Sequence, residues 1–179
     1  MTIIITKIRS DGIIMIADSF VSVNGNPTDR TLKLILIDKF RGGISIWGQH
    51  RPFIVADSRI TFGRFIEEFI RVDTSSNLRE FCERLKDHMN AQHINEERRL
   101  MGCHICGYMP YESVMYPCFY HIHNKRVNDI FNEEILDQFI IGEDCTPQMR
   151  GIKAGITHNG NYLIYSMFYR DISNLKIMR

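Results

Sequence analysis

A hydroxyl and a carboxylate near the start of the chain are candidates for nucleophilic chemistry. Alternating apolar residues predict two strands on either side of a turn signal at Ser10-Asp11-Gly12. If the turn centres near Ser10 and Asp11, antiparallel pairing brings Thr2 beside Asp18 and Ser19. A side-chain hydroxyl at the extreme N-terminus then lies near a carboxylate at the end of the neighbouring strand.

Two further residues are expected at the same edge. Lys33 opens the third predicted strand, from which its ammonium group could reach Asp18. Gly48 lies where the fourth predicted strand gives way to a helix. A glycine there lets a substrate approach the backbone closely, and its N–H points toward whatever is bound. Thr2, Asp18, Lys33 and Gly48 therefore form one candidate site.

The elements that must position this site are strands first and helices second. The predicted strands are residues 2–8, 13–18, 32–37, 43–47, 103–108 and 115–123. Apolar residues three and four apart predict one helix around residues 62–70, a second from residue 78 and a last one over residues 162–172. Pro52 suits the first turn of the first helix, and Asn77 with Glu80 fits a capping box for the second. Residues 126–142 fit neither pattern clearly. Antiparallel strands with segregated helices indicate an α+β fold.

The composition is that of one globular domain, residues 1–179. Hydrophobic residues make up 44% and charged residues 24% of the chain. The 22 basic and 21 acidic residues nearly cancel, so we expect no nucleic-acid partner. No apolar run approaches the roughly 20 residues of a membrane span, and no signal peptide is evident. We therefore expect no membrane partner. Five cysteines, an odd number, indicate reduced thiols in a cytoplasmic protein.

The charges are unevenly distributed along the chain. Residues 129–144 carry six acidic side chains and no Lys or Arg, whereas residues 147–179 carry five basic side chains and Asp171 as the one acidic residue. Two solvated faces would explain this pattern. Head-to-tail contact between subunits of a homo-oligomer would also explain it.

Four ordered segments carry a resemblance to a known family. The segments are Thr2-Ile3-Ile4-Ile5, Ile14-Met15-Ile16-Ala17-Asp18-Ser19, Leu32-Lys33-Leu34 and Ile44-Ser45-Ile46-Trp47-Gly48. They resemble the proteasome β-subunit family of N-terminal-nucleophile (Ntn) hydrolases, with its bacterial HslV-like relatives. The intervals from Thr2 to Asp18 and to Gly48 match that family without a gap, and Lys33 needs a shift of one. The resemblance is good over residues 2–72.

The resemblance implies a fold, a reaction and a role for each residue. The fold would be a four-layer αββα sandwich of the proteasome-subunit type. Thr2 would be the nucleophile, and its own α-amine, with a reference pKa near ~7.7–8.0, would be the general base. Lys33, held by Asp18, would lower the pKa of the Thr2 hydroxyl and amine, and the Gly48 N–H would bind the oxyanion. The reaction would be that of a threonine protease, amide hydrolysis of peptide or protein substrates through an acyl-enzyme, without cofactor or metal.

Two observations bear on whether such a site is complete. The sequence begins with Met1, so the amine of Thr2 becomes free only after Met1 is removed, which we expect because threonine is small. Ile141-Gly142-Glu143-Asp144 stands where the family has a Gly-Ser-Gly-like turn with a supporting serine. Asp171 and Ser173 are the candidates for the family's late Asp and Ser pair.

The alternative function is a non-catalytic subunit of the same fold that acts as a structural or binding component of a homo-oligomer.

Cysteines and histidines in the middle of the chain suggest two other sites. Cys103 and Cys106 with His121 and His123 have ligand types that zinc prefers. Residues three apart on a strand face opposite sides, so the two cysteines are not expected to share one ion. Cys106 with His121 could instead form a nucleophile and base across a hairpin, although no third orienting group is evident. The expected role of these residues is structural, with the cysteines as small buried thiols and the histidines as partly exposed strand residues.

Overall fold

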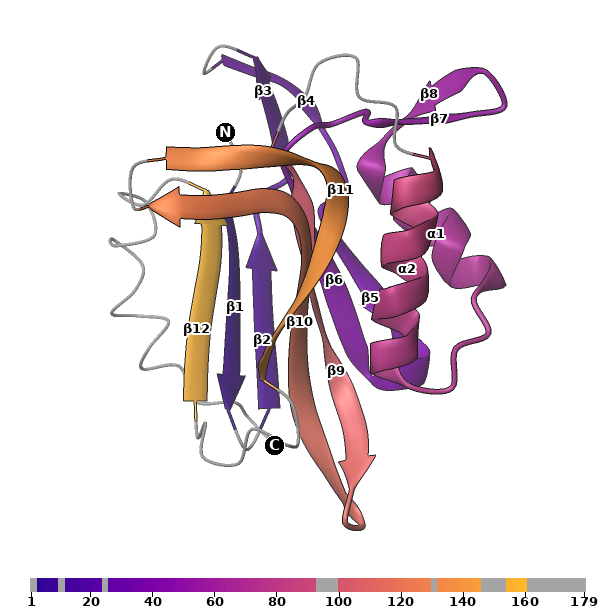
Figure 1. Ribbon diagram of the computed structural model, residues 1–179, viewed down its shortest axis with the longest axis vertical. Helices are drawn as coiled ribbons and strands as arrows, with labels where there is room; N and C mark the ends of the chain where they lie inside the picture. The colour runs from indigo at the N-terminus through magenta and orange to yellow at the C-terminus, as the bar shows by residue number, and fades with distance from the viewer. Residues whose placement is uncertain are drawn as a thin grey trace.

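Two helices and two antiparallel sheets form three layers in the computed structural model (Figure 1). The structure describes residues 3–9, 12–23, 26–92, 100–129, 132–145 and 154–160. The five-stranded sheet has the order β11-β10-β9-β6-β5 and occupies the middle layer. The three-stranded sheet, in the order β12-β1-β2, packs on one of its faces, and α1 and α2 pack on the other.

The strands and helices have the following bounds. The five-stranded sheet contains β5 (Leu34–Ile37), β6 (Gly42–Trp47), β9 (Gly102–Tyr111), β10 (Val114–Asp129) and β11 (Asn132–Cys145). The three-stranded sheet contains β1 (Ile3–Arg9), β2 (Gly12–Ala17) and β12 (Ala154–Gly160). Two further hairpins belong to neither of these sheets: β3 (Phe20–Val23) with β4 (Asn26–Arg30), and β7 (Phe53–Val55) with β8 (Ser58–Ile60). The helices are α1 (Phe62–Val72) and α2 (Leu78–Gln92), and a 3-10 turn, η1 (Asp38–Phe40), joins β5 to β6.

The larger hydrophobic core fills the space between the helices and the five-stranded sheet. Side chains alternate along β6, so that Ile44 and Ile46 enter this core. The helices contribute residues spaced three and four apart, among them Phe65, Ile66, Phe69, Phe81, Leu85 and Met89, all buried. A smaller cluster of Ile8, Cys106 and Phe119 lies between the two sheets. The middle of the five-stranded sheet is therefore buried on both faces, whereas Leu36 on its edge strand β5 is 71% exposed.

The predicted four-layer αββα sandwich is wrong. The described residues are mainly strands in antiparallel sheets, and their two helices lie on the same face of the five-stranded sheet. Apolar periodicity identifies a helix, but it does not say which face of which sheet the helix covers. The helix predicted over residues 162–172 lies outside the described residues. Of residues 126–142, which fitted neither pattern, residues 126–129 end β10 and residues 132–142 belong to β11.

A polar side chain caps the N-terminus of each described helix. Thr61 caps α1, and its hydroxyl accepts a hydrogen bond from the Arg64 N–H over 3.2 Å. The prediction that Pro52 lies in the first turn is wrong, because β7 and β8 intervene before α1. The predicted cap of α2 is present, since the Asn77 side chain accepts from the Glu80 N–H over 2.9 Å. The Glu80 carboxylate, however, accepts from the N–H and hydroxyl of Ser76 and not from the Asn77 N–H.

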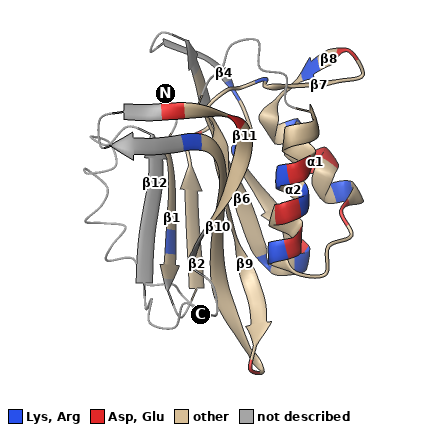
Figure 2. Cartoon of the chain, in the orientation of Figure 1, with Lys and Arg blue, Asp and Glu red and all other residues tan. Residues whose placement is uncertain are grey.

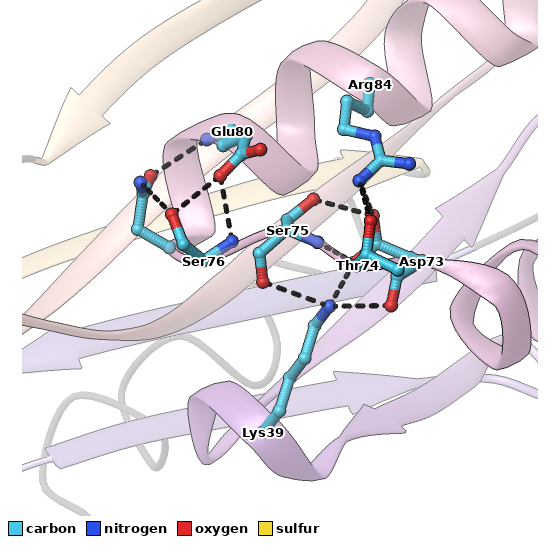
Figure 3. A network of polar contacts seen from close by, with 8 residues as sticks. Lys39, Asp73, Thr74, Ser75, Ser76, Glu80 and Arg84 are labelled. Carbon is cyan, nitrogen blue, oxygen red and sulfur yellow. Dashed lines mark hydrogen bonds and ion pairs between the residues drawn. The ribbon is translucent and has the colours of Figure 1, made fainter.

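A buried carboxylate ties the loop between the helices to η1. The side chain of Asp73 is fully buried and forms ion pairs with Lys39 from η1 and Arg84 from α2 (Figure 3). The hydroxyl and N–H of Ser75 also donate to it, over 2.6 and 3.2 Å. Burial raises the pKa of the Asp73 carboxyl, but hydrogen bonds from Lys39 and Ser75 outweigh burial and hold that pKa below its ordinary value.

Charged side chains of both signs cover the outer surface of the helices (Figure 2). Arg64 pairs with Glu68 over 2.8 Å and Arg79 pairs with Glu83 over 3.2 Å, each one helical turn apart. This face is therefore mixed in charge. Neither described helix combines the length and the apolarity needed to cross a bilayer.

Candidate functional site

One carboxylate joins two residues from different sheets. Oδ1 of Asp18 accepts the main-chain N–H of Ile3 over 2.7 Å, and Oδ2 accepts from Nζ of Lys33 over 2.9 Å. The Lys33 side chain is 6% exposed and that of Asp18 is 27% exposed. A buried ammonium group needs such a partner, because the energy of removing it from water is otherwise not recovered. Asp18 therefore fixes a positive charge beside the start of β1.

The pairing of β1 with β2 explains why Asp18 reaches Ile3. Ile4 lies opposite Ala17 and Ile8 opposite Ile13, which is the register expected for a turn centred between Ser10 and Asp11. The Asp18 N–H continues the ladder by donating to the Ile3 carbonyl over 3.0 Å. The sequence-based pairing of the first hairpin is thus confirmed over its described residues.

Lys33 enters this site from the five-stranded sheet. It directly precedes β5, and its carbonyl accepts from the Ile46 N–H of β6 over 2.9 Å. This bond continues the β5–β6 ladder, in which Leu34 lies opposite Ser45. The ends of β1, β2, β5 and β6 consequently meet at one edge of the two sheets.

Gly48 follows directly after β6, two residues beyond Ile46. Its φ of +94° lies in the region that side chains disfavour. A Cβ at this position would meet the Leu100 carbonyl oxygen at 2.4 Å and Cα of Met101 at 2.5 Å. The backbone conformation and the close approach of the chain both require glycine here. The segment 46–48 therefore leaves the sheet at the same end where Lys33 enters it.

Thr2, the predicted nucleophile, lies outside the described residues, as does Met1. Ile3, which follows Thr2 in the chain, is described, and its N–H contacts Asp18 directly. The structure thus brings together Asp18 and Lys33, and it places Gly48 close along the chain to the β6 residue that bonds Lys33. The role of the Ile3 N–H was not foreseen, although the hairpin register implies it.

The segment that stands where the family has a turn is not a turn in this structure. Ile141-Gly142-Glu143-Asp144 lies within β11, and Gly142 pairs with His121 of β10. A Cβ on Gly142 would meet the His121 ring at 1.8 Å, so this glycine makes room for a side chain of the neighbouring strand. Asp171 and Ser173 lie outside the described residues.

The cysteine candidates are part of the cores, whereas His121 and His123 are half-buried. Cys103 and Cys106 are buried on opposite faces of β9, one in each hydrophobic cluster. Burial raises the pKa of the Cys103 thiol to about 12, which keeps it protonated. Within the described part of the chain, no group of three or more His, Cys, Asp or Glu residues could hold a metal ion. His121 and His123 stack edge to face, 4.7 Å apart.

Comparisons of the chain with protein-family models, with curated proteins and with solved structures find no match. The geometry of the site and the residues around it therefore indicate what the chain does.

Proposed function

We propose that the chain is a threonine-type amide hydrolase that cleaves peptide bonds after Met1 has been removed. One observation carries the proposal: the Asp18 carboxylate binds both the buried Lys33 ammonium group and the N–H of the residue that follows Thr2. A fixed positive charge near an N-terminal hydroxyl is what an alkoxide nucleophile needs. The resemblance of the Thr2, Asp18, Lys33 and Gly48 segments to Ntn hydrolases supports the same reaction.

The proposed reaction begins with proton transfer within one residue. The free α-amine of Thr2 takes the proton of its own hydroxyl, and Oγ1 attacks the carbonyl carbon of the substrate. The Gly48 N–H stabilises the oxyanion that forms. The tetrahedral intermediate then collapses to an ester, and the departing amine takes the proton from the α-ammonium group. Water, activated by the same amine, hydrolyses the ester and restores Thr2.

Lys33 and Asp18 have supporting roles in this proposal. The ammonium group of Lys33 stabilises the developing alkoxide, and Asp18 holds Lys33 in place over 2.9 Å. Because Asp18 also accepts from the Ile3 N–H, it fixes the strand that carries the nucleophile relative to the charge that activates it.

The proposal includes a cytoplasmic homo-oligomer. The β9–β10 hairpin projects beyond the other strands (Figure 1), and its tip exposes Val114, Met115 and Tyr116. Exposed apolar side chains gathered in one place favour association between copies. Sedimentation of the purified protein measures this directly, and a monomer at all concentrations would remove this part of the proposal.

The hydrolase itself is tested with the processed chain and a mixture of short peptides. Hydrolysis should be lost in Thr2→Ala and retained in Ser19→Ala, which removes an exposed hydroxyl from the end of the same strand pair. Equal hydrolysis by Thr2→Ala and the parent protein would exclude Thr2 as the nucleophile. A processed parent protein that hydrolyses none of the peptides, and that an electrophile specific for N-terminal threonine does not label, would favour the non-catalytic subunit.

A further inference from the structure

Three fully buried polar residues lie between the two sheets. Thr6 comes from β1, Ser45 from β6 and His104 from β9, and each has 0% of its surface exposed. Oγ1 of Thr6 and Nδ1 of His104 share a hydrogen bond of 3.2 Å, which crosses from one sheet to the other. The rings of Phe119 and His104 form a T-shaped contact with their centroids 5.1 Å apart.

Ser45 belongs to the same group by its register. Ser45 lies directly opposite His104 in the antiparallel β6–β9 pair, so both side chains project from the same face of the sheet. Ile44 and Ile46, on either side of Ser45, point into the core under the helices. Ser45 therefore points away from the helices, toward the layer that contains Thr6.

The hydroxyl of Ser45 has no hydrogen-bond partner among the described residues. Buried hydroxyl groups without a partner destabilise the folded state, and nearly all buried polar groups in native proteins are bonded to protein or to an ordered water. Such a water makes about three hydrogen bonds. The hydroxyls of Thr6 and Ser45 and the imidazole of His104 are polar groups of the kind that hold one.

We propose that one ordered water molecule binds Ser45 and links it to the Thr6–His104 pair. The hydrated cluster of Thr6, Ser45 and His104 then forms a polar bridge from β1 to β6 and β9. We assign a water and not a larger ligand because all three residues have 0% of their surface exposed and lie on paired strands.

The bridge has a consequence for the candidate site, and this part rests on the proposed function. Thr6 lies three residues after Ile3 on β1, and Ser45 lies three residues before Gly48 on the strand that leads to it. Both spans correspond to roughly 10 Å of extended chain. The distance from the start of β1, which follows the proposed nucleophile in the chain, to the proposed oxyanion donor after β6 depends on how the two sheets are held together. Thr6, Ser45 and His104 are therefore positioning residues.

A double-mutant cycle tests the water directly. Thr6→Val keeps the shape of the side chain and removes its hydroxyl, and Ser45→Ala removes the other hydroxyl. We expect Ser45→Ala to lower the folding equilibrium constant about fivefold, as the loss of one satisfied hydrogen bond does. In protein that already carries Thr6→Val, Ser45→Ala should lower the folding equilibrium constant by a factor at least about threefold smaller than it does alone, because the shared water has already lost a partner.

Several outcomes would contradict the proposed water. An unchanged or increased stability of Ser45→Ala would show that its hydroxyl is an unsatisfied group. Strictly additive effects would show that Thr6 and Ser45 share no water. Thr6→Ser, which keeps the hydroxyl, is the control, and in that background Ser45→Ala should have its full effect. Ser45→Ala alone decides whether the water is present if Thr6→Val does not fold.

The positioning role has its own measurement. If the processed protein reacts with an electrophile specific for N-terminal threonine, Ser45→Ala should slow that reaction several-fold while the folded fraction stays complete. An unchanged rate in folded Ser45→Ala would overturn the positioning role. If the parent protein does not react at all, the proposed hydrolase activity is excluded. The double-mutant unfolding cycle still decides whether the ordered water is present.

Discussion

Lys33 and Asp18 form an ion pair of 2.9 Å in which the lysine side chain is 6% exposed and the carboxylate 27% exposed. The pair joins the end of β2 to the start of β5, and hence one sheet to the other. Because Asp18 also accepts from the Ile3 N–H, three chain segments converge on one side chain. This relationship is what connects the fold to the proposed chemistry.

Removing Lys33 should both destabilise the protein and abolish hydrolysis. In Lys33→Ala the carboxylate of Asp18 loses its buried counter-ion. The unfolding free energy should fall by up to about 3 kcal/mol, and solvent at the partly exposed Asp18 reduces this value. Urea unfolding measures this change. Arg64→Ala is the matched control, because it breaks an exposed ion pair and should cost less than about 1 kcal/mol. Equal costs for the two variants would mean that Lys33 is not a buried partner.

Asp73 should make the stability of the protein sensitive to acid. Its pKa in the folded state lies below its ordinary value of 3.8, so the folded state holds this proton less tightly than the unfolded state. The stabilisation by Asp73 is therefore fully present above pH 4 to 5 and is lost as the pH falls through the lowered pKa. Urea unfolding of Asp73→Asn between pH 7 and pH 3 checks this.

The variant Asp73→Asn should be less stable at pH 7 by about 1–3 kcal/mol, since its ion pairs with Lys39 and Arg84 are lost. The difference from the parent protein should shrink toward pH 3. Asp87→Asn, which alters the solvent-exposed partner of Lys86, is the control and should show little difference at any pH. A gap between Asp73→Asn and the parent protein that stays constant with pH would contradict the assignment.

Much of the first half of the fold could be predicted from local patterns. The first hairpin, the strands β5 and β6 and the apolar face of each described helix follow from periodicity and turn residues. Local patterns do not say which helix packs on which sheet, so the four-layer prediction depended on the family resemblance, and it is wrong for the described residues. Strand β11 was missed because its charged residues, such as Glu134 and Asp137, interrupt the apolar alternation.

The candidate site could be predicted in part for a similar reason. The meeting of Asp18 and Lys33 follows from the register of one hairpin and from the place where β5 begins. The bridge between Thr6 and His104 could not be predicted, because the two residues are 98 positions apart and only the packing of the sheets brings them together.

Cys103 should be inert toward thiol reagents in the folded protein. Its pKa of about 12 and its full burial leave almost no thiolate at pH 8. We expect iodoacetamide to modify Cys103 in denatured protein and not in native protein, as mapped by peptide mass. Rapid modification of Cys103 at pH 8 in the native state would contradict both its burial in the core and its raised pKa.

The central claim is that Thr2 becomes a free, reactive N-terminus beside Lys33 and Asp18. The most direct measurement is the intact mass of untagged protein from its own organism, before and after treatment with an electrophile specific for N-terminal threonine. The account predicts a mass that lacks Met1 and then gains one adduct, located on Thr2 by peptide mapping. A native protein that retains Met1 and gains no adduct would contradict it.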